Sequence, residues 1–319
     1  MLDRLSVCIA LVVAAGSVVA QSYPQPRPIR LVAPYAAGST VDIVARLFGR
    51  KLSEALGQQV VVDNLPGAGG TIGTAAAARA SPDGHTLLHI PGTQVVSPAL
   101  YRNPGFDIER DFAPIAITAQ APNVIVVHPS VPVASLGDLI SLAKSRPGHI
   151  TYSHTGLGTP THLFMEMLKS TARIDLAGVP YKSAAQSMIE VVNGQVFTSF
   201  TNVASGLPYI NTGRVKAIAV SSDKRSPLLA GVPTIAETFP GYEASVWFAF
   251  LAPAGTPREI VGRLSAEFQR IARLPDIGER LAQQGLILDV TDAEQSARRI
   301  RADTAKWTRL VRELGIRPE

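Results

Sequence analysis

The residues best suited to chemistry lie within residues 152–163, where a short extended stretch runs into a glycine loop and a helix start. Gly156 and Gly158 allow a tight turn and bring backbone N–H groups close to a guest. Thr159 is a favourable N-cap, and Pro160 suits the first helical position. Such a helix start offers unpaired N–H groups and a partial positive charge, which favours a carboxylate or phosphate. An ordinary strand-to-helix connection would show the same pattern.

A second loop of this design lies near the N-terminus, at residues 35–40. Ser39 followed by Asp42 indicates a helix N-terminus. Apolar residues at helical spacing predict a helix over residues 40–56. Residues 64–73 form a glycine-rich turn whose spacing does not fit a dinucleotide loop, so we interpret this turn as one wall of a cleft. Two helix starts facing each other across such a cleft would favour an anionic guest.

Several ionisable side chains beside these loops have two interpretations. Asp42 could bind an ammonium or hydroxyl group of a ligand, or it could cap its own helix. His154 lies in the loop itself, whereas His162 could be a core residue or a ligand contact. Lys182, in a further loop at residues 181–183, could pair with a carboxylate or remain solvated.

The sequence carries no known catalytic motif. It contains no G-x-S-x-G elbow, no H-E-x-x-H pair and no Walker loop. Ser153, His154 and His162 could supply a nucleophile and a base, but their spacing offers no orienting acid. The six histidines show no paired metal-ligand spacing. We therefore expect a protein without enzymatic activity, metal or cofactor.

Composition and the N-terminus narrow the function further. The chain has 319 residues, of which 46% are hydrophobic, enough for two lobes of roughly 100–200 residues. A net charge of +5, 6% aromatic residues and no dense run of Lys or Arg argue against nucleic-acid binding. Arg4 precedes an apolar run within residues 1–20, which predicts a signal peptide and a secreted protein. Cys8, the single cysteine, lies in that run, so the mature chain would have no thiol.

Strands alternating with helices predict an α/β protein whose ligand lies at the carboxyl ends of the strands. The alternation begins at residue 29 and restarts near residue 133. We therefore predict a two-lobed protein with a cleft between the lobes. The first lobe would comprise residues 24–124 and 245–319, and the second lobe residues 125–244.

Short motifs along the chain resemble those of one known family. They are Ala33-Pro34-Tyr35-Ala36-Ala37-Gly38, Asn64-Leu65-Pro66-Gly67-Ala68-Gly69-Gly70, Pro82-Asp83-Gly84, Gly156-Leu157-Gly158, Val179-Pro180-Tyr181-Lys182 and Ala252-Pro253-Ala254-Gly255-Thr256-Pro257. In this order they resemble the solute-binding receptors of tripartite tricarboxylate transporters, the Bug family, over residues 24–316.

The resemblance implies a monomeric periplasmic receptor of the type II binding-protein fold, which closes on a small organic acid and serves a membrane permease. By position, the carboxylate would meet residues 35–39 from one lobe and 153–159 from the other, with 181–183 completing the cleft. The candidate ligand-binding residues are Tyr35, Ala36, Ala37, Gly38, Ser39, Asp42, Gly69, Ser153, His154, Thr155, Gly156, Gly158, Thr159, His162, Tyr181, Lys182, Thr201 and Asn202.

Three positions differ from the usual pattern of this family. Ser39 stands where a second glycine is usual, and His154 where a small residue is usual. Thr201 stands where an aspartate is common, which removes an ammonium partner and argues against an amino-acid ligand. His154 could contact a distal acid group. Two alternative functions remain open from the sequence: a sensor subunit that signals to a membrane kinase, and a secreted hydrolase.

Overall fold

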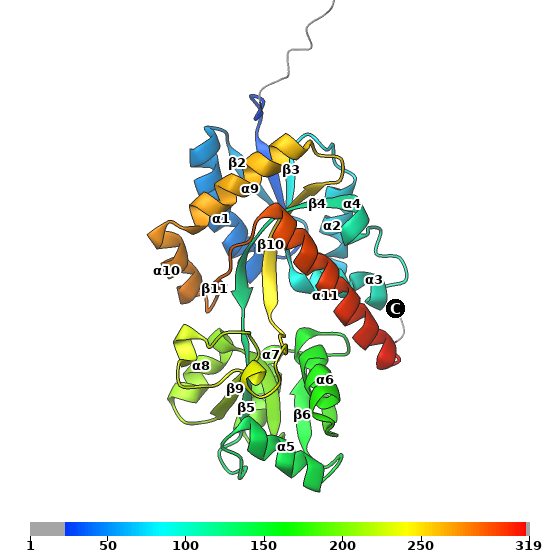
Figure 1. The fold of residues 1–319 in the computed structure, drawn as a ribbon, viewed down its shortest axis with the longest axis vertical. Helices are drawn as coiled ribbons and strands as arrows, with labels where there is room; N and C mark the ends of the chain where they lie inside the picture. The colour runs from blue at the N-terminus through cyan, green and yellow to red at the C-terminus, as the bar shows by residue number, and fades with distance from the viewer. Residues whose placement is uncertain (1–22, 317–319) are drawn as a thin grey trace, which may run out of the picture.

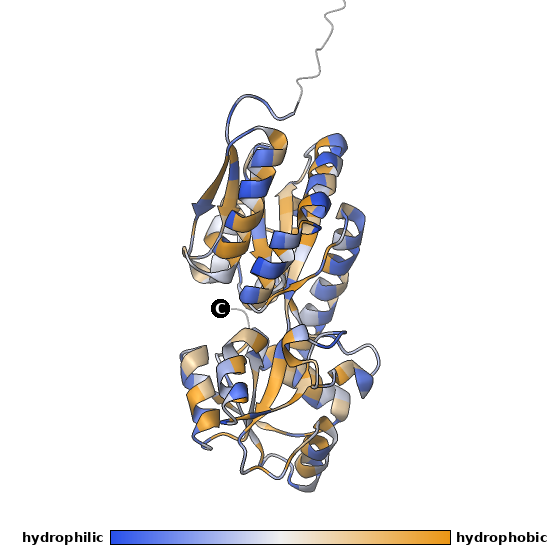
Figure 2. Ribbon diagram, turned by 90° about the vertical axis from the view of Figure 1, so that its left-hand side faces the viewer, coloured by the Kyte–Doolittle hydropathy of each residue, from blue (hydrophilic) through white to orange (hydrophobic). Residues whose placement is uncertain are grey.

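The computed structural model describes residues 23–316, so the predicted signal peptide lies outside the described residues. The chain forms two α/β lobes, one above the other in Figure 1, each built on its own sheet. The strands are mainly apolar, whereas the outer helices carry both polar and apolar residues (Figure 2). No helix within this range is long and apolar enough to cross a membrane. The predicted two-lobed α/β class is confirmed.

Lobe 1 contains a six-stranded sheet in the order β11-β4-β10-β3-β1-β2. Its strands are β1 (Ile29–Ala33), β2 (Val60–Asn64), β3 (Thr86–Pro91), β4 (Phe112–Ala121), β10 (Val246–Pro253) and β11 (Ile287–Leu288). Its helices are α1 (Thr40–Leu56), α2 (Thr71–Ala78), α3 (Ser97–Leu100), α4 (Ile108–Asp111), α9 (Arg258–Ala272), α10 (Pro275–Gln283) and α11 (Ala293–Glu313), with 3₁₀ turns at Ala68–Gly70 and Gly92–Val96.

Lobe 2 contains a five-stranded sheet in the order β7-β6-β8-β5-β9. Its strands are β5 (Asn123–Val127), β6 (Thr151–His154), β7 (Ala177–Pro180), β8 (Thr198–Asn202) and β9 (Lys216–Val220). Its helices are α5 (Leu136–Ser145), α6 (Pro160–Ala172), α7 (Ala184–Val192) and α8 (Val203–Asn211), with 3₁₀ turns at Pro227–Leu229 and Ile235–Glu237. Because β6 pairs in parallel with both β7 and β8, the three strands end at the same edge.

The chain crosses between the lobes twice, and the two crossings lie side by side. The first crossing runs from β4 through Pro122 into β5, and the second returns through Ser245 into β10. Val246 pairs with Ala121 across them, and the Ser245 hydroxyl donates to Gln120 Oε1 at 3.0 Å. Such a pair of adjacent strands is a natural hinge.

Local sequence accounts for most helix limits, with two exceptions. Helix α1 begins after Ser39, whose hydroxyl accepts from the Asp42 N–H, and it ends at Gly57 with φ 62°. Helix α10 was not predicted. Thr291 and Glu294 have the spacing of a capping box, but Asp292 is the cap of helix α11 and forms the capping box with Gln295. The Thr291 hydroxyl instead accepts from Ile117 N–H of β4 at 3.2 Å.

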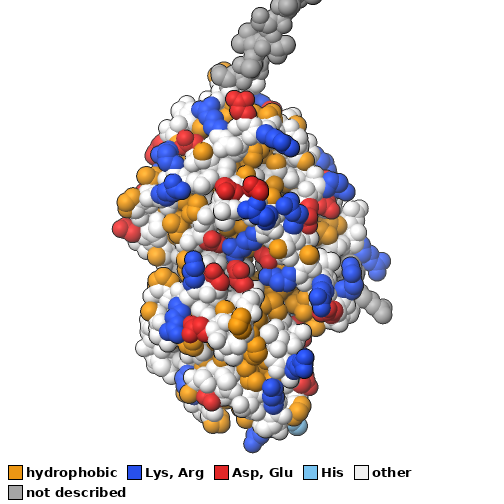
Figure 3. Space-filling view, in the orientation of Figure 1, with side chains coloured by type: hydrophobic (Ala, Val, Ile, Leu, Met, Phe, Trp, Pro, Cys, Tyr) orange, Lys and Arg blue, Asp and Glu red, His pale blue; other side chains and the backbone are white. Residues whose placement is uncertain are grey.

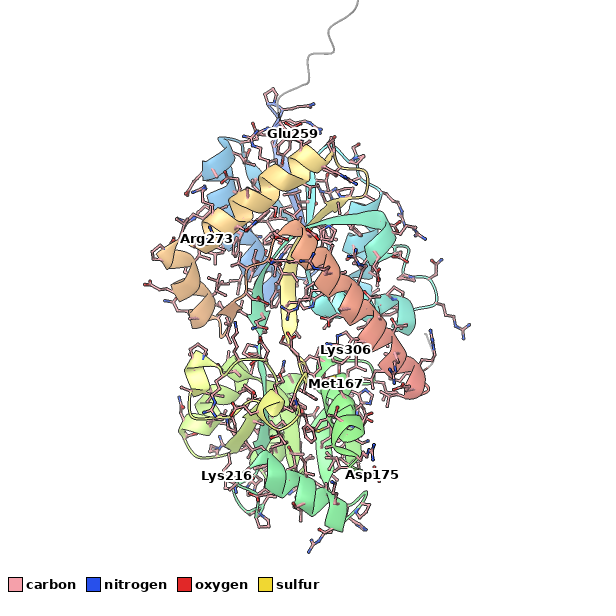
Figure 4. The ribbon with its side chains drawn as sticks, in the orientation of Figure 1. Met167, Asp175, Lys216, Glu259, Arg273 and Lys306 are labelled. Carbon is pink, nitrogen blue, oxygen red and sulfur yellow. The ribbon has the colours of Figure 1, made fainter. Side chains whose placement is uncertain are left out.

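Helix α11 of lobe 1 also reaches lobe 2. The Trp307 ring lies 5.4 Å from the Phe164 ring of α6, centroid to centroid. The Tyr242 hydroxyl donates to the Phe164 carbonyl at 2.9 Å, and both contacts belong to one apolar cluster that extends through both lobes. In Figure 4, Lys306 of α11 lies just above Met167 of α6, where the two helices are in contact. Helix α6 is therefore held at the hinge by side chains from outside its own sheet.

Trp307→Ala should lower the free energy of unfolding by about 3–5 kcal/mol, since the Trp307 side chain is buried and its removal leaves a cavity against Phe164. Urea unfolding followed by circular dichroism measures this change. Arg309→Ala is the control on the same helix, because its surface ion pair with Glu313 should contribute about 1 kcal/mol or less. Equal stabilities of the two variants would contradict the inferred packing.

Candidate functional site

A cavity of about 280 Å³ lies between the lobes beside the hinge. Figure 3 shows the constriction between the lobes and the mixture of basic and acidic side chains on that face. The residues lining the cavity are Thr40, Ala121, Asn123, Thr155, Pro160, Thr161, Ala184, Ser187, Met188, Ser199, Phe200, Thr201, Asn202, Ser205, Val246 and Phe248. The hydrogen-bonding groups of this lining are hydroxyls and amides, and none of its side chains is ionisable.

The starts of four helices meet at this cavity. Thr40 is the first residue of α1, Pro160 the first of α6 and Ala184 the first of α7, while Asn202 caps α8. The first belongs to lobe 1 and the others to lobe 2. Because each helix start carries a partial positive charge, their convergence gives an uncharged cavity a positive potential. This arrangement suits a small anion.

The start of α6 differs from the expectation in one respect. Thr159 is the N-cap residue, but its side chain does not cap the helix, because its hydroxyl donates to the Gly156 carbonyl at 2.7 Å. Within residues 23–316, the backbone N–H groups of Thr161 and Thr40 have no hydrogen-bond partner. Both residues line the cavity, as do Ala184 and Ser205 of lobe 2, whose N–H groups also have no partner within these residues, so both lobes offer N–H groups to a ligand.

Asp42 organises the loop at residues 35–39. Its carboxylate accepts from the Gly38 N–H at 2.9 Å, from the Asn64 amide at 3.0 Å and from Arg46 Nε at 3.0 Å. Burial raises the pKa of Asp42, but these hydrogen bonds outweigh it and hold the pKa below its usual value. Asp42 is 3% exposed and does not line the cavity, so the structure favours the loop-supporting interpretation over direct ligand contact.

His154 and His162 support the other loop from behind. His154 Nδ1 accepts from the Gly156 N–H at 3.2 Å, and His162 Nδ1 accepts from the Gly158 N–H at 3.3 Å. The ring centroids lie 4.9 Å apart, and neither residue lines the cavity. Burial lowers the pKa of His154, and burial together with the neighbouring His154 lowers the pKa of His162 to about 4. Both rings are therefore neutral at pH 7, and the expected contact of His154 with a distal acid group does not fit this placement.

Ser153 points to the face of β6 opposite His154, as neighbours on a strand do. The Ser187 hydroxyl of α7 donates to Ser153 Oγ at 2.7 Å, and Ser153 is fully buried. Ser153 and the two histidines therefore cannot form the nucleophile–base pair that the hydrolase alternative requires. Among the described residues, no group of three or more His, Cys, Asp or Glu side chains could hold a metal ion.

The remaining candidates fall into two groups. Thr155, Thr201 and Asn202 line the cavity. The others adjoin it or support it: the Tyr35 hydroxyl donates to the Gly69 carbonyl at 3.0 Å, and the Tyr181 N–H donates to the His154 carbonyl at 2.8 Å. Those outside the lining are Tyr35, Ala36, Ala37, Gly38, Ser39, Gly69, Gly156, Gly158, Thr159, Tyr181 and Lys182.

Sequence reasoning missed two kinds of lining residue. Thr40 lies one position after the predicted contact range 35–39, and Thr161 lies two positions after the range 153–159. The helix-start signal could have included both residues. Asn123 and Phe248 come from the crossings between lobes, where no local motif marks a residue as facing a cavity.

Comparison with known proteins agrees with this geometry. Residues 44–316 match the profile of the family named "Tripartite tricarboxylate transporter family receptor". The chain is 32% identical over 320 residues to protein BugT of Bordetella pertussis, which covers 99% of this chain and 98% of BugT.

Two solved structures are also similar. Rpa4515 of R. palustris with adipate has a TM-score of 0.74 and 33% identity, covering 93% of this chain and 100% of that one. MatC (Rpa3494) of Rhodopseudomonas palustris with bound malate has a TM-score of 0.68 and 28% identity, covering 89% and 99% of the two chains. The resemblance inferred from the motifs is thus confirmed, and this chain belongs to the receptor family of tripartite tricarboxylate transporters, the Bug family.

Proposed function

We propose that the interlobe cavity binds a small organic carboxylate through backbone N–H groups at helix starts. The observation that carries this proposal is the pair of unpartnered N–H groups of Thr40 and Thr161, one from each lobe, at a cavity lined by uncharged residues. The adipate and malate named for two similar structures support the same ligand class. The ligand would join the lobes, because each lobe supplies part of its contacts.

The strength of such binding can be estimated. A helix start stabilises an anion by about 0.3–1 kcal/mol when exposed and up to about 2 kcal/mol when partly buried. Charge-assisted hydrogen bonds contribute about 1.5–3 kcal/mol each. Three helix starts and two or more such bonds reach about −8 kcal/mol, which corresponds to a micromolar Kd. A receptor that must release its cargo would need affinity of this order.

The ligand would be released to a membrane permease in the periplasm when the lobes reopen at the two adjacent crossings. A monomer suffices for binding, because one chain supplies both walls of the cavity. The protein would perform no chemistry. Signalling to a membrane kinase through the same closed lobes is the alternative function.

Ala184→Asp should weaken binding of adipate and malate at least about fivefold, because it puts a negative charge at the start of α7, where Ala184 lines the cavity. A second anion a few ångströms from the ligand costs about 1–4 kcal/mol. Isothermal titration calorimetry measures the Kd. The charge would also favour the helix itself, so a loss of affinity could not be attributed to unfolding.

Ala184→Asn is the matched control for that charge. It has nearly the same size and should change the Kd less than threefold. Equal weakening by both variants would show that size, and not charge, governs this wall. No binding of either acid to the unaltered protein, together with no binding of other small carboxylates, would contradict the proposed function.

Acid should destabilise the glycine loop of lobe 2. Because the pKa of His162 in the fold is about 4, below its ordinary 6.5, the unfolded chain binds more protons between these values. The contribution of His162 is therefore complete above pH 6.5 and is lost as the pH falls through about 4. This shift in the pKa of His162 corresponds to a loss on the order of 3 kcal/mol in the free energy of unfolding. Urea unfolding at pH 7.5 and pH 4.5 measures it.

His162→Asn is the informative variant, because its side-chain oxygen can still accept from the Gly158 N–H but cannot take up a proton. Its stability should fall less than that of the unaltered protein over the same pH interval. His89, whose pKa burial lowers to about 3, contributes equally to both proteins and cancels in the difference. Identical pH dependence of the two proteins would rule out the role assigned to His162.

A further inference from the structure

We infer that the end of the cavity formed by β5, β8 and α8 binds an uncharged hydrogen-bonding group, so that the ligand is an acid with one carboxylate and a neutral polar group at its other end. This inference rests on the proposed function and specifies its ligand class. The polar residues of this neutral end are Asn123, Thr201, Asn202 and Ser205.

Two buried side chains point to a ligand group at the neutral end. Asn123 is 5% exposed and Thr201 is 8% exposed, and both line the cavity. Neither the Asn123 amide nor the Thr201 hydroxyl makes a hydrogen bond within residues 23–316. Both side chains line the cavity, so their hydrogen-bonding groups are open to a ligand group there. An amide and a hydroxyl can each donate and accept, which suits a neutral group.

The first two N–H groups of α8 are occupied within the protein. The Val203 N–H donates to the Pro122 carbonyl at 3.1 Å, and the Ala204 N–H donates to Asn202 Oδ1 at 2.9 Å. The Ser205 N–H, the third of this helix, has no hydrogen-bond partner within residues 23–316, and Ser205 lines the cavity, so this group can donate to a ligand oxygen. Asn202 retains its amide N–H₂, which can donate to a carbonyl or hydroxyl oxygen.

No Lys or Arg among residues 23–316 lines the neutral end. Arg46, the cation nearest along α1, is paired with Asp42 outside the lining, and the neutral His154 and His162 lie behind the other loop. Lys182 is exposed and does not line the cavity. A carboxylate placed between Asn123 and Thr201 would lose its water without gaining a counter-charge, which is unfavourable.

The sheet order fixes the length of the ligand. The carboxylate end lies at Thr155 and Thr161, after β6. The neutral end lies one strand away at Thr201 and Asn202 of β8 and two strands away at Asn123 of β5. One to two strand spacings amount to about 5–10 Å. This distance suits a chain of about six carbons or a para-substituted aromatic acid, and the cavity wall between the ends is apolar, with Met188, Phe200 and Phe248.

Calorimetry with matched acids tests the inference. The six-carbon probes are adipate, its monoamide, 6-hydroxyhexanoate and hexanoate; the aromatic probes are terephthalate and its monoamide. In each series the neutral polar acid should bind at least tenfold more tightly than the corresponding dicarboxylate, and in the six-carbon series also than hexanoate. A tighter Kd for the dicarboxylates would overturn this inference and leave carboxylate binding intact, whereas no binding of any probe would contradict the proposed function itself.

Two variants assign the preference to the neutral end. Thr201→Val keeps the shape of the side chain and removes the hydroxyl, so it should weaken the monoamides about threefold to tenfold and leave hexanoate within twofold. Ser205→Lys adds a cation at an exposed helical position that lines the cavity, so it should strengthen dicarboxylate binding at least tenfold. Equal effects of either variant on all probes would place the neutral group elsewhere and refute the assignment.

Discussion

The proposed binding of a carboxylate depends on a hydrogen bond that α6 does not make within the protein. The Thr159 side chain turns back to the Gly156 carbonyl instead of capping the helix, and the Thr161 N–H therefore stays open toward the cavity. The Thr40 N–H of α1 faces the same space from lobe 1. Two such groups in opposite lobes make an anion the partner that completes both helices, and this is a direct physical reason for the lobes to close on it.

Much of the surrounding structure holds these N–H groups in place. Asp42 binds the backbone of the loop before α1, while His154 and His162 accept from the glycine N–H groups of the loop before α6. Phe164, one turn into α6, is fixed by Trp307 and Tyr242 at the hinge. Ionisable residues near the site thus position the backbone and leave the cavity itself uncharged, which lowers the cost of releasing the ligand.

Local signals in the sequence predicted the architecture and the two facing loops well. The helix over residues 40–56 has both of its limits as predicted, since Ser39 and Gly57 are strong start and stop signals. Thr155, Thr201 and Asn202, three of the residues predicted to contact a ligand, line the cavity. Helix α10 was missed because no hydroxyl or acidic residue caps its start: Leu274 precedes Pro275, and no side-chain cap is present.

Other features depend on contacts that no local pattern encodes. The direction of the His154 side chain follows from the register of β6 against β7 and β8, which decides that Ser153 and not His154 faces α7. Asn123 reaches the cavity because β5 lies beside β8, a pairing between residues far apart in the chain. The Thr159 hydroxyl lies within hydrogen-bond distance of the Gly156 carbonyl and of the Thr161 hydroxyl. Its donation to the Gly156 carbonyl depends on the turn of the glycine loop.

Amide chemical shifts of the ¹⁵N-labelled protein during titration with adipate or another small carboxylate that binds would test the central claim most directly. We predict saturable downfield shifts of the Thr40 and Thr161 N–H protons, because both would donate to the carboxylate. The Ala204 N–H, already bonded to Asn202, should keep its hydrogen bond and serve as the internal reference. Saturation of binding with unchanged Thr40 and Thr161 resonances would contradict the account.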